Sequence, residues 1–411
     1  MPPTRNRRRR SIILTGAVLI ALSGPGQTAG FSVFVDPITE ALDVTRGQLT
    51  FAYLIGTLAA STTGTWLGRR LDRDGVASGL RLVAIALGSA AVLAALSPNL
   101  IVLTLAIYGL RSFGQTGMTL SASVFVAKNV VERRGAALGL LTAVGGSAIA
   151  ITPLIASRLI PEFGWRTTWV LLGAVVAVVG LVTSTRMVRL RLEHPNPLDE
   201  PVADTADEVL APRHLRRNGF LVVTAGYATT GFVSTALAFH QIAVLGERGI
   251  SATAAAGNFV PQSLAAAAVA LGVGRLVDRV PGRLVIPVDM VLLAAAVGSV
   301  SFVDSNLGAV GFGIALGSAA SAMAASEGTL LARWIGTATL GTWRGRMTSV
   351  MVISTAIAPF AFTLIADAAG SFSAAARLVV ILPLAVAVIA AVTPLPEGRT
   401  RIRAGAVSRD G

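Results

Sequence analysis

Two short polar stretches of this chain nearly repeat each other, and each lies between two long apolar segments. They are Gly68-Arg-Arg-Leu-Asp72-Arg73 and Gly274-Arg-Leu-Val-Asp278-Arg279, and they start 206 residues apart. The same offset separates further landmarks: Pro153 from Pro359, and Gly164 from Gly370. This period is far longer than the roughly 20–50 residues of a solenoid repeat. The chain is therefore predicted to fold as two similar halves.

The composition places both halves in a membrane. The 411 residues are 53% hydrophobic, and only 13% are charged, against about 25% in a soluble domain. A hydrocarbon core about 30 Å thick requires roughly 20 apolar residues per helix. The chain is accordingly predicted to be an all-α membrane protein with twelve transmembrane helices, at 11–35, 47–68, 80–97, 100–126, 134–158, 165–186, 218–246, 252–274, 284–303, 305–332, 346–369 and 372–394. We expect an N-terminal six-helix bundle at 1–186, a cytoplasmic linker at 187–217 and a C-terminal bundle with a cytoplasmic tail at 218–411.

The distribution of basic residues orients these helices. The formal net charge of +13 is concentrated in alternate loops, which is the positive-inside pattern. An even number of spans then places both termini in the cytoplasm, with the protein in the plasma membrane. The apolar run after the first arginines is too long for a signal peptide, so a retained first helix is expected. No basic face is interleaved with stacking aromatics, and we therefore exclude nucleic acid as a partner.

Several kinds of chemistry are excluded by what the sequence lacks. Cys is absent, which rules out disulfides and catalytic thiols, and the three His residues are too scattered for a metal cluster. The segment Gly24-Pro-Gly26 is not a phosphate loop, because no Lys-Ser/Thr follows it. The sequence also shows no pairing of a nucleophile with a base. We expect neither an enzyme nor a cofactor, and no ATP-driven transport by this chain alone.

Arg111 is the strongest candidate for a functional residue. It lies within about 3 Å of the middle of the fourth predicted span, at 1.5 Å per residue. A charge at that depth is costly, and by default it faces a partner or a wet cavity. Gln115 is four residues on and shares its face. One interpretation is an anion-binding site, and the other is a structural arginine bonded to backbone carbonyls or Gln side chains.

The first predicted span is interrupted at Ser23-Gly24-Pro25-Gly26-Gln27. Pro25 removes a helix donor, and the glycines loosen the turn. Broken helices at membrane depth are typical of substrate sites, where protein or water satisfies the backbone. Gln27 would then be the polar side chain that faces the solute. A packing kink is the alternative.

The second half offers three amide side chains as binding candidates. Asn258 and Gln262 are four residues apart on one helix face, with Gln262 near the centre of its span. Gln241 lies in the outer part of the seventh span. These residues extend the predicted solute site into the second half.

Two titratable residues of the second half are candidates for proton coupling. His240 is in the outer part of the seventh span and could act as a proton switch, or it only makes hydrogen bonds near the interface. Glu327 is in the cytoplasmic third of the tenth span and could accept a coupling proton. An ion pair with Arg279 or Arg333 is the alternative for Glu327. Asp289, one to two turns inside the ninth span, is expected to reach water along its stem.

The repeated loop motif in a chain of twelve spans resembles the major facilitator superfamily over roughly 11–394. That resemblance implies two pseudo-symmetric six-helix bundles, the major facilitator fold. It also implies that the two loops lock the halves together at the cytoplasmic face. The residues that carry this clamp here are Gly68, Asp72, Arg73 and Gly75, then Gly274, Asp278 and Arg279. Arg111 matches the arginine of the fourth-helix motif of the superfamily.

Within that superfamily, segments of the first, second and seventh spans are similar to the monocarboxylate-porter-like and oxalate:formate antiporter-like branch. They are 27–37, 53–57 and 239–251. Oxalate carriers also use basic residues in the second half, and this chain has none buried there. The resemblance therefore favours an anion with one carboxylate over a dicarboxylate.

The sequence leads to a secondary active transporter that works by alternating access on a small organic anion, a monocarboxylate, with proton coupling as an option. Its partners would be the solute and the lipid bilayer, and we expect a monomer. An efflux carrier for hydrophobic compounds or drugs is the first alternative, because few charges are buried and small residues are abundant. A non-transporting membrane sensor is the alternative from another class.

Overall fold

The computed structural model describes residues 3–130, 134–189, 208–209, 212–277, 280–335, 340–396 and 401–402. Its first half is helical throughout. The elements are α1 (Pro3–Leu22), η1 (Gly24–Gly26), α2 (Thr28–Ser32), α3 (Val35–Leu42), α4 (Arg46–Ala60), α5 (Thr63–Asp74), α6 (Val76–Leu96), α7 (Leu100–Gly109), η2 (Leu110–Met118), α8 (Thr119–Asn129), α9 (Arg134–Ile149) and α10 (Ile151–Arg189).

The second half is built in the same way. Its elements are α11 (Arg213–Gly246), α12 (Ala252–Gly257), α13 (Phe259–Val277), α14 (Gly282–Gly298), η3 (Ser299–Phe302), α15 (Asn306–Ile335), α16 (Leu340–Ala369), α17 (Phe372–Val379) and α18 (Ile381–Val392). Two strands of two residues each, β1 (Glu208–Val209) and β2 (Arg401–Ile402), pair antiparallel outside the bundles. The predicted all-α class is therefore confirmed.

Each of the twelve predicted spans is helical over most of its length, although the helices are more interrupted than a sequence of single rods. Eight stretches of the described residues are long and apolar enough to cross a bilayer. One of them, Ala137–Val188, contains both the fifth and the sixth predicted spans and turns at Gly164, where φ is 76°. Other spans are divided into shorter helices, such as α4 and α5. The count of twelve spans stays a prediction.

The repeat seen in the sequence recurs in the backbone. Gly164 and Gly370 both adopt positive φ, at 76° and 78°. Asp43 and Gly249, again 206 residues apart, do the same, at 51° and 81°. Glycine adopts this conformation without steric cost, and Asp tolerates it better than most residues. Two helix ends therefore turn in the same way in both halves.

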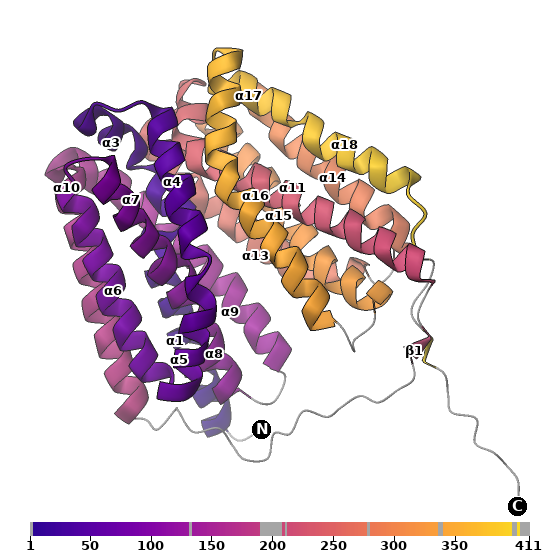
Figure 1. Cartoon of the computed structure of the whole chain (residues 1–411), viewed down its shortest axis with the longest axis horizontal. Coiled ribbons are helices and arrows are strands. Elements are labelled where there is room, and N and C mark those ends of the chain that lie inside the picture. Colours follow the sequence, from indigo (N-terminus) through magenta and orange to yellow (C-terminus); the bar gives the residue numbers. More distant parts are fainter. Residues whose placement is uncertain are drawn as a thin grey trace, which may run out of the picture.

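Each half has its own apolar core, and the two bundles meet along a limited set of helices (Figure 1). α4 packs against α16, α2 against α11, α9 against α13 and α10 against α12. In Figure 1 the bundles approach each other at the end where α3 and α17 lie. They diverge toward the opposite end, where α1 begins and α5 ends. We call the first the closed end and the second the terminus end. The outer faces of both bundles carry exposed large apolar side chains, as expected for contact with lipid.

Aromatic rings close the contact between the halves. Phe51 of α4 lies 5.4 Å from Phe360 of α16, measured between ring centroids. A second contact is made by Phe239 of α11, whose ring centroid lies 4.8 Å from that of Tyr53 of α4 and 5.9 Å from that of Phe31 of α2. Phe239 is 1% exposed and packs into the apolar core of the opposite half. This ring therefore joins the two halves directly.

Candidate functional site

The predicted interruption of the first span is present and positions the site. α1 ends at Leu22, the short turn η1 follows, and α2 begins at Thr28. Gly26 is pressed against the fourth span: a Cβ atom there would lie 2.1 Å from the Leu110 carbonyl oxygen and 2.6 Å from the Gly114 Cα. Real side chains essentially never approach so closely, so glycine is required at this crossing. The break thus brings the backbone of the first span beside Arg111.

The fourth span is distorted at the same level. η2 is a π-helical segment, in which the helix turn is wider than in an α-helix. Such segments are rare in proteins, and those that occur are often at functional sites. Arg111 belongs to this segment and is only 4% exposed. Its Nη1 donates to the Gly26 carbonyl oxygen at 3.1 Å and to the Thr28 Oγ1 at 3.2 Å. Its Cζ lies 5.2 Å from the centroid of the Tyr53 ring, a cation–π distance.

Both sequence interpretations of Arg111 find a counterpart in these contacts. The bond to the Gly26 carbonyl is the structural one, because it satisfies a carbonyl freed by the helix break. These contacts do not use every hydrogen-bond donor of the guanidinium, however. Its Nε is buried and has no hydrogen-bond partner among the described residues. Arg111 also lines a cavity between the halves.

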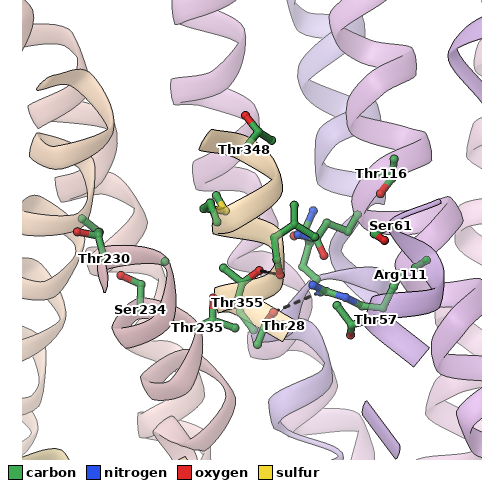
Figure 2. A pocket seen from close by; sticks show the side chains of 18 of the residues that line it. Thr28, Thr57, Ser61, Arg111, Thr116, Thr230, Ser234, Thr235, Thr348 and Thr355 are labelled. Carbon is green, nitrogen blue, oxygen red and sulfur yellow. Dashed lines mark hydrogen bonds between the residues drawn. The ribbon is translucent and has the colours of Figure 1, made fainter. Parts of the chain in front are cut away.

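That cavity has a volume of about 580 Å³ and is lined by both bundles. The first half contributes Arg111, which is labelled in Figure 2, together with Gln27 and Gln115. The hydroxyl-bearing residues of the lining come from both halves: Thr28, Thr57, Ser61, Thr116, Tyr227, Thr230, Ser234, Thr235, Thr348 and Thr355. Arg111 is the one Arg, Lys, His, Asp or Glu in the lining, counted over the described part of the chain. The cavity therefore presents many polar groups among apolar side chains, with a single fixed positive charge at its side.

Gln27 and Gln115 both line this cavity. The Gln27 Nε2 donates to the Ser23 Oγ at 2.8 Å, which holds this amide at the helix break. Gln115 follows Arg111 by one turn and lines the same cavity. A binding role for these two amides stays a prediction.

Of the three amides of the second half, Gln241 and Asn258 are buried and Gln262 is half-buried, and none of them lines this cavity. The Gln241 Nε2 donates to the Ala255 carbonyl oxygen at 2.8 Å. Asn258 and Gln262 face α15, where a Cβ atom on Gly313 would lie 2.4 Å from the Asn258 Oδ1. Both polar atoms of the Asn258 side chain lack a partner among the described residues. A binding role for these three residues stays a prediction.

His240 is not among the residues that line the cavity. Its Nε2 is 3.0 Å from the Pro359 carbonyl oxygen and 3.3 Å from the Thr363 Oγ1. The ring is fully buried, and it stacks on Phe362 at 5.3 Å and on Phe372 at 5.0 Å. The alternative in which His240 makes structural hydrogen bonds therefore has direct support, and its proton-switch role remains a prediction.

The acidic candidates of the second half are buried near the terminus end. Glu327 is 3% exposed in α15. Of the arginines considered as its partners, Arg279 lies outside the described residues, and the Arg333 Nη1 lies 3.5 Å from the Val280 carbonyl oxygen. Asp289 in α14 was expected to reach water, but it is only 6% exposed, so its carboxylate is buried within the bundle. The Asp289 Oδ2 has no partner among the described residues.

The first copy of the clamp motif is described in part. Gly68 and Arg73 are on α5, and Gly75, with φ of 82°, separates α5 from α6. Arg73 is exposed. The side chain of Asp72 lies outside the described residues, as do Asp278 and Arg279 of the second copy, where Gly274 falls within α13. The clamp therefore stays a prediction.

The sequence interpretation missed the hydroxyl lining, the Tyr53 ring beside Arg111 and the contact of Phe239 with that ring. A signal for the lining was present. Thr57 and Ser61 are four residues apart within one span, as are Thr230 and Ser234, and this spacing places each pair on one helix face. No comparable signal distinguished Tyr53 or Phe239 from ordinary core aromatics.

A bundle of two similar helical halves with a cavity lined by both is the architecture of a membrane carrier. The chain matches the Major Facilitator Superfamily over residues 16–312. Since this match covers most of the sequence, the chain belongs to the Major Facilitator Superfamily. Members of this superfamily are generally carriers of small solutes across membranes rather than enzymes.

Individual relatives agree with this assignment. An MFS-type efflux pump of Mycolicibacterium smegmatis (strain ATCC 700084 / mc(2)155) is 32% identical over 206 residues, and the match covers 45% of this chain and 45% of that protein. Two crystal structures of a bacterial homologue of the human lysosomal transporter Spinster are similar in fold. The inward-facing and occupied form has a TM-score of 0.70 and 16% identity, covering 93% of this chain and 95% of that one. The inward-facing and unoccupied form has a TM-score of 0.70 and 17% identity, covering 95% and 96%.

Proposed function

We propose that this protein is a secondary active carrier for a small organic anion with one carboxylate. The observation that carries the proposal is Arg111, the single fixed charge on the described wall of a cavity shared by both halves. A carboxylate forms strong, directional bonds with a guanidinium. A monoanion requires one such partner, and the many hydroxyls can serve the rest of a polar solute.

The arrangement of the halves supports transport by alternating access. The bundles touch through Phe31, Tyr53 and Phe239 at the closed end and diverge toward the terminus end. With the Arg-rich loops in the cytoplasm, this corresponds to a cavity that communicates with the cytoplasmic side. The proposal places the protein as a monomer in the plasma membrane with cytoplasmic termini, in the monocarboxylate-porter-like branch of the superfamily. Proton coupling through His240 or Glu327 is part of the same proposal.

An efflux carrier for hydrophobic compounds is the second candidate. The relative described as an efflux pump favours it. The lining gives it less support, because ten hydroxyl-bearing residues, two amides and one cation lie among the apolar side chains of the cavity. Covering polar groups with an apolar solute is unfavourable wherever a group loses a hydrogen bond to water and gains none in return.

Flux measurements separate the two candidates. Purified protein is reconstituted in liposomes, and exchange is measured for matched monocarboxylates, dicarboxylates, neutral amides and cationic hydrophobic dyes. We expect monocarboxylates to exchange fastest and Arg111→Lys to exchange slowly. Exchange of dyes with no exchange of any carboxylate would replace the anion carrier by the efflux carrier.

A further inference from the structure

Tyr53 contacts three groups that belong to different parts of the proposed mechanism. Its hydroxyl lies 3.0 Å from the Thr28 Oγ1. Its ring faces the Arg111 guanidinium, with 5.2 Å between Cζ and the ring centroid. The same ring meets Phe239 edge-on, with the centroids 4.8 Å apart and an interplanar angle of 71°. The side chain is fully buried, so each contact is shielded from water.

Phe239 connects Tyr53 to the other half of the protein. It comes from α11 in the second half, yet it packs with the buried apolar residues of the first half. Phe31 lies 5.3 Å from Tyr53 and 5.9 Å from Phe239, so the three rings form one contact across the halves. Aromatic pairs at such distances contribute beyond the area that they bury. Opening the closed end requires Phe239 to leave Tyr53.

Thr28 connects this ring cluster to the cavity. Its hydroxyl accepts from the Arg111 Nη1 at 3.2 Å (Figure 2). The same hydroxyl shares a hydrogen bond with the Tyr53 hydroxyl at 3.0 Å. Thr28 and Arg111 both line the cavity, whereas Tyr53 does not. A carboxylate in the cavity competes with Thr28 for the guanidinium. It also neutralises the charge that attracts the Tyr53 ring.

We propose that Tyr53 is the positioning residue through which occupancy of Arg111 alters the contact between the halves at the closed end. This inference rests on the proposed function for the identity of the ligand. With the cavity empty, Arg111 and Thr28 hold Tyr53 against Phe239, and the closed end stays shut. When a carboxylate binds Arg111, that hold weakens and the contact with Phe239 loosens. Binding of the solute at Arg111 would in this way make the closed end easier to open, which is the step that exchange of solute across the membrane requires.

The test uses a single introduced thiol as a reporter of the closed end, since the chain has no native Cys. Gly257→Cys suits this purpose. A Cβ atom there meets only the Leu154 Cδ1 at 3.8 Å, and Leu154 lies in the opposite half. Opening of the closed end separates these residues. A membrane-impermeant maleimide applied from the side of the closed end then labels the introduced thiol faster.

The variants are compared in the Gly257→Cys background, first without any ligand. Tyr53→Phe keeps the ring and removes the hydroxyl, and Thr28→Val removes the other partner of the same hydrogen bond. Tyr108→Phe is the matched control, because the Tyr108 hydroxyl lies 3.4 Å from the Thr63 Oγ1 and its ring borders a different, apolar hollow. We expect Tyr53→Phe and Thr28→Val to raise the labelling rate about two- to tenfold, the range of one hydrogen bond. Tyr108→Phe is expected to label like the parent.

A double-mutant cycle then tests the connection to Arg111. Arg111→Met and Tyr53→Phe combined are expected to raise labelling no more than the larger single change, because both break one chain of contacts. Additive effects, or a parent-like rate for both Tyr53→Phe and Thr28→Val, would overturn the link.

The ligand arm separates this inference from the proposed function. A saturating monocarboxylate is expected to speed labelling of the reporter thiol in the parent and to have little further effect in Tyr53→Phe. If the carboxylate speeds both proteins equally, the anion site stands and the role of Tyr53 is refuted. If no carboxylate affects the parent while the ligand-free cycle is non-additive, the link stands and the anion substrate is refuted.

Discussion

Replacing Gly26 by Ala probes the crossing on which the site depends. The added Cβ atom would lie 2.1 Å from the Leu110 carbonyl oxygen, where ordinary contact begins near 3.4 Å. The first and fourth spans would therefore have to separate by about 1 Å or more. The Arg111 Nη1, now 3.1 Å from the Gly26 carbonyl oxygen, would move out of hydrogen-bond range.

The magnitude follows from these two effects. Overpacking of a close contact costs about 1–3 kcal/mol. Loss of a hydrogen bond to a charged group adds about 1.5–3 kcal/mol. The combined loss of about 2.5–6 kcal/mol is a large fraction of a typical folding free energy of about 5–15 kcal/mol. We expect Gly26→Ala to unfold at a clearly lower temperature and to lose most anion exchange.

Gly139→Ala is the matched control. It places the same methyl group on α9, where a Cβ atom meets nothing within 4 Å. Because Ala favours helix over Gly by about 0.5–1 kcal/mol, this variant should be as stable as the parent or slightly more so. Thermal unfolding in detergent, followed by tryptophan fluorescence, compares the three proteins. Equal unfolding temperatures and equal exchange for Gly26→Ala and Gly139→Ala would refute the reasoning.

Three further predictions concern charge. Arg111→Lys keeps the charge but loses the planar fork, so exchange should fall at least tenfold while the protein elutes as a folded species in size-exclusion chromatography. Asp72→Asn and Asp278→Asn should slow turnover and shift the conformational equilibrium about ten- to a hundredfold toward the state open at the cytoplasmic face. Labelling of cysteines introduced at that face measures the shift, and unchanged labelling would contradict the clamp. If His240 or Glu327 carries the coupling proton, its replacement by Gln should abolish uptake driven by a pH gradient and leave solute exchange intact.

The sequence was sufficient for features set by local chemistry. The interruption at Gly24-Pro25-Gly26 follows from two residue types that weaken helices, and the structure breaks the first span there. The depth of Arg111 follows from counting residues along one span. Such inferences need no knowledge of which helices are neighbours.

Features that depend on packing between spans were less accessible. Asn258 and Gln262 share a helix face as expected, yet that face packs on α15 rather than on the cavity. Nothing within the seventh span shows that Phe239 enters the core of the other half. The π-helical distortion at Leu110–Met118 is likewise a property of the crossing, because it lies where the fourth span meets Gly26.

The central claim is that Arg111 binds the carboxylate of the transported solute. Its most direct test is the affinity of the purified protein for the monocarboxylate that exchanges fastest and for the primary amide of the same carbon skeleton, measured in the parent and in Arg111→Met. The account predicts that the parent prefers the carboxylate by about 10- to 100-fold, from a charge-assisted pair of roughly 1.5–3 kcal/mol, and that Arg111→Met binds both about equally. An undiminished preference for the carboxylate in Arg111→Met would contradict it.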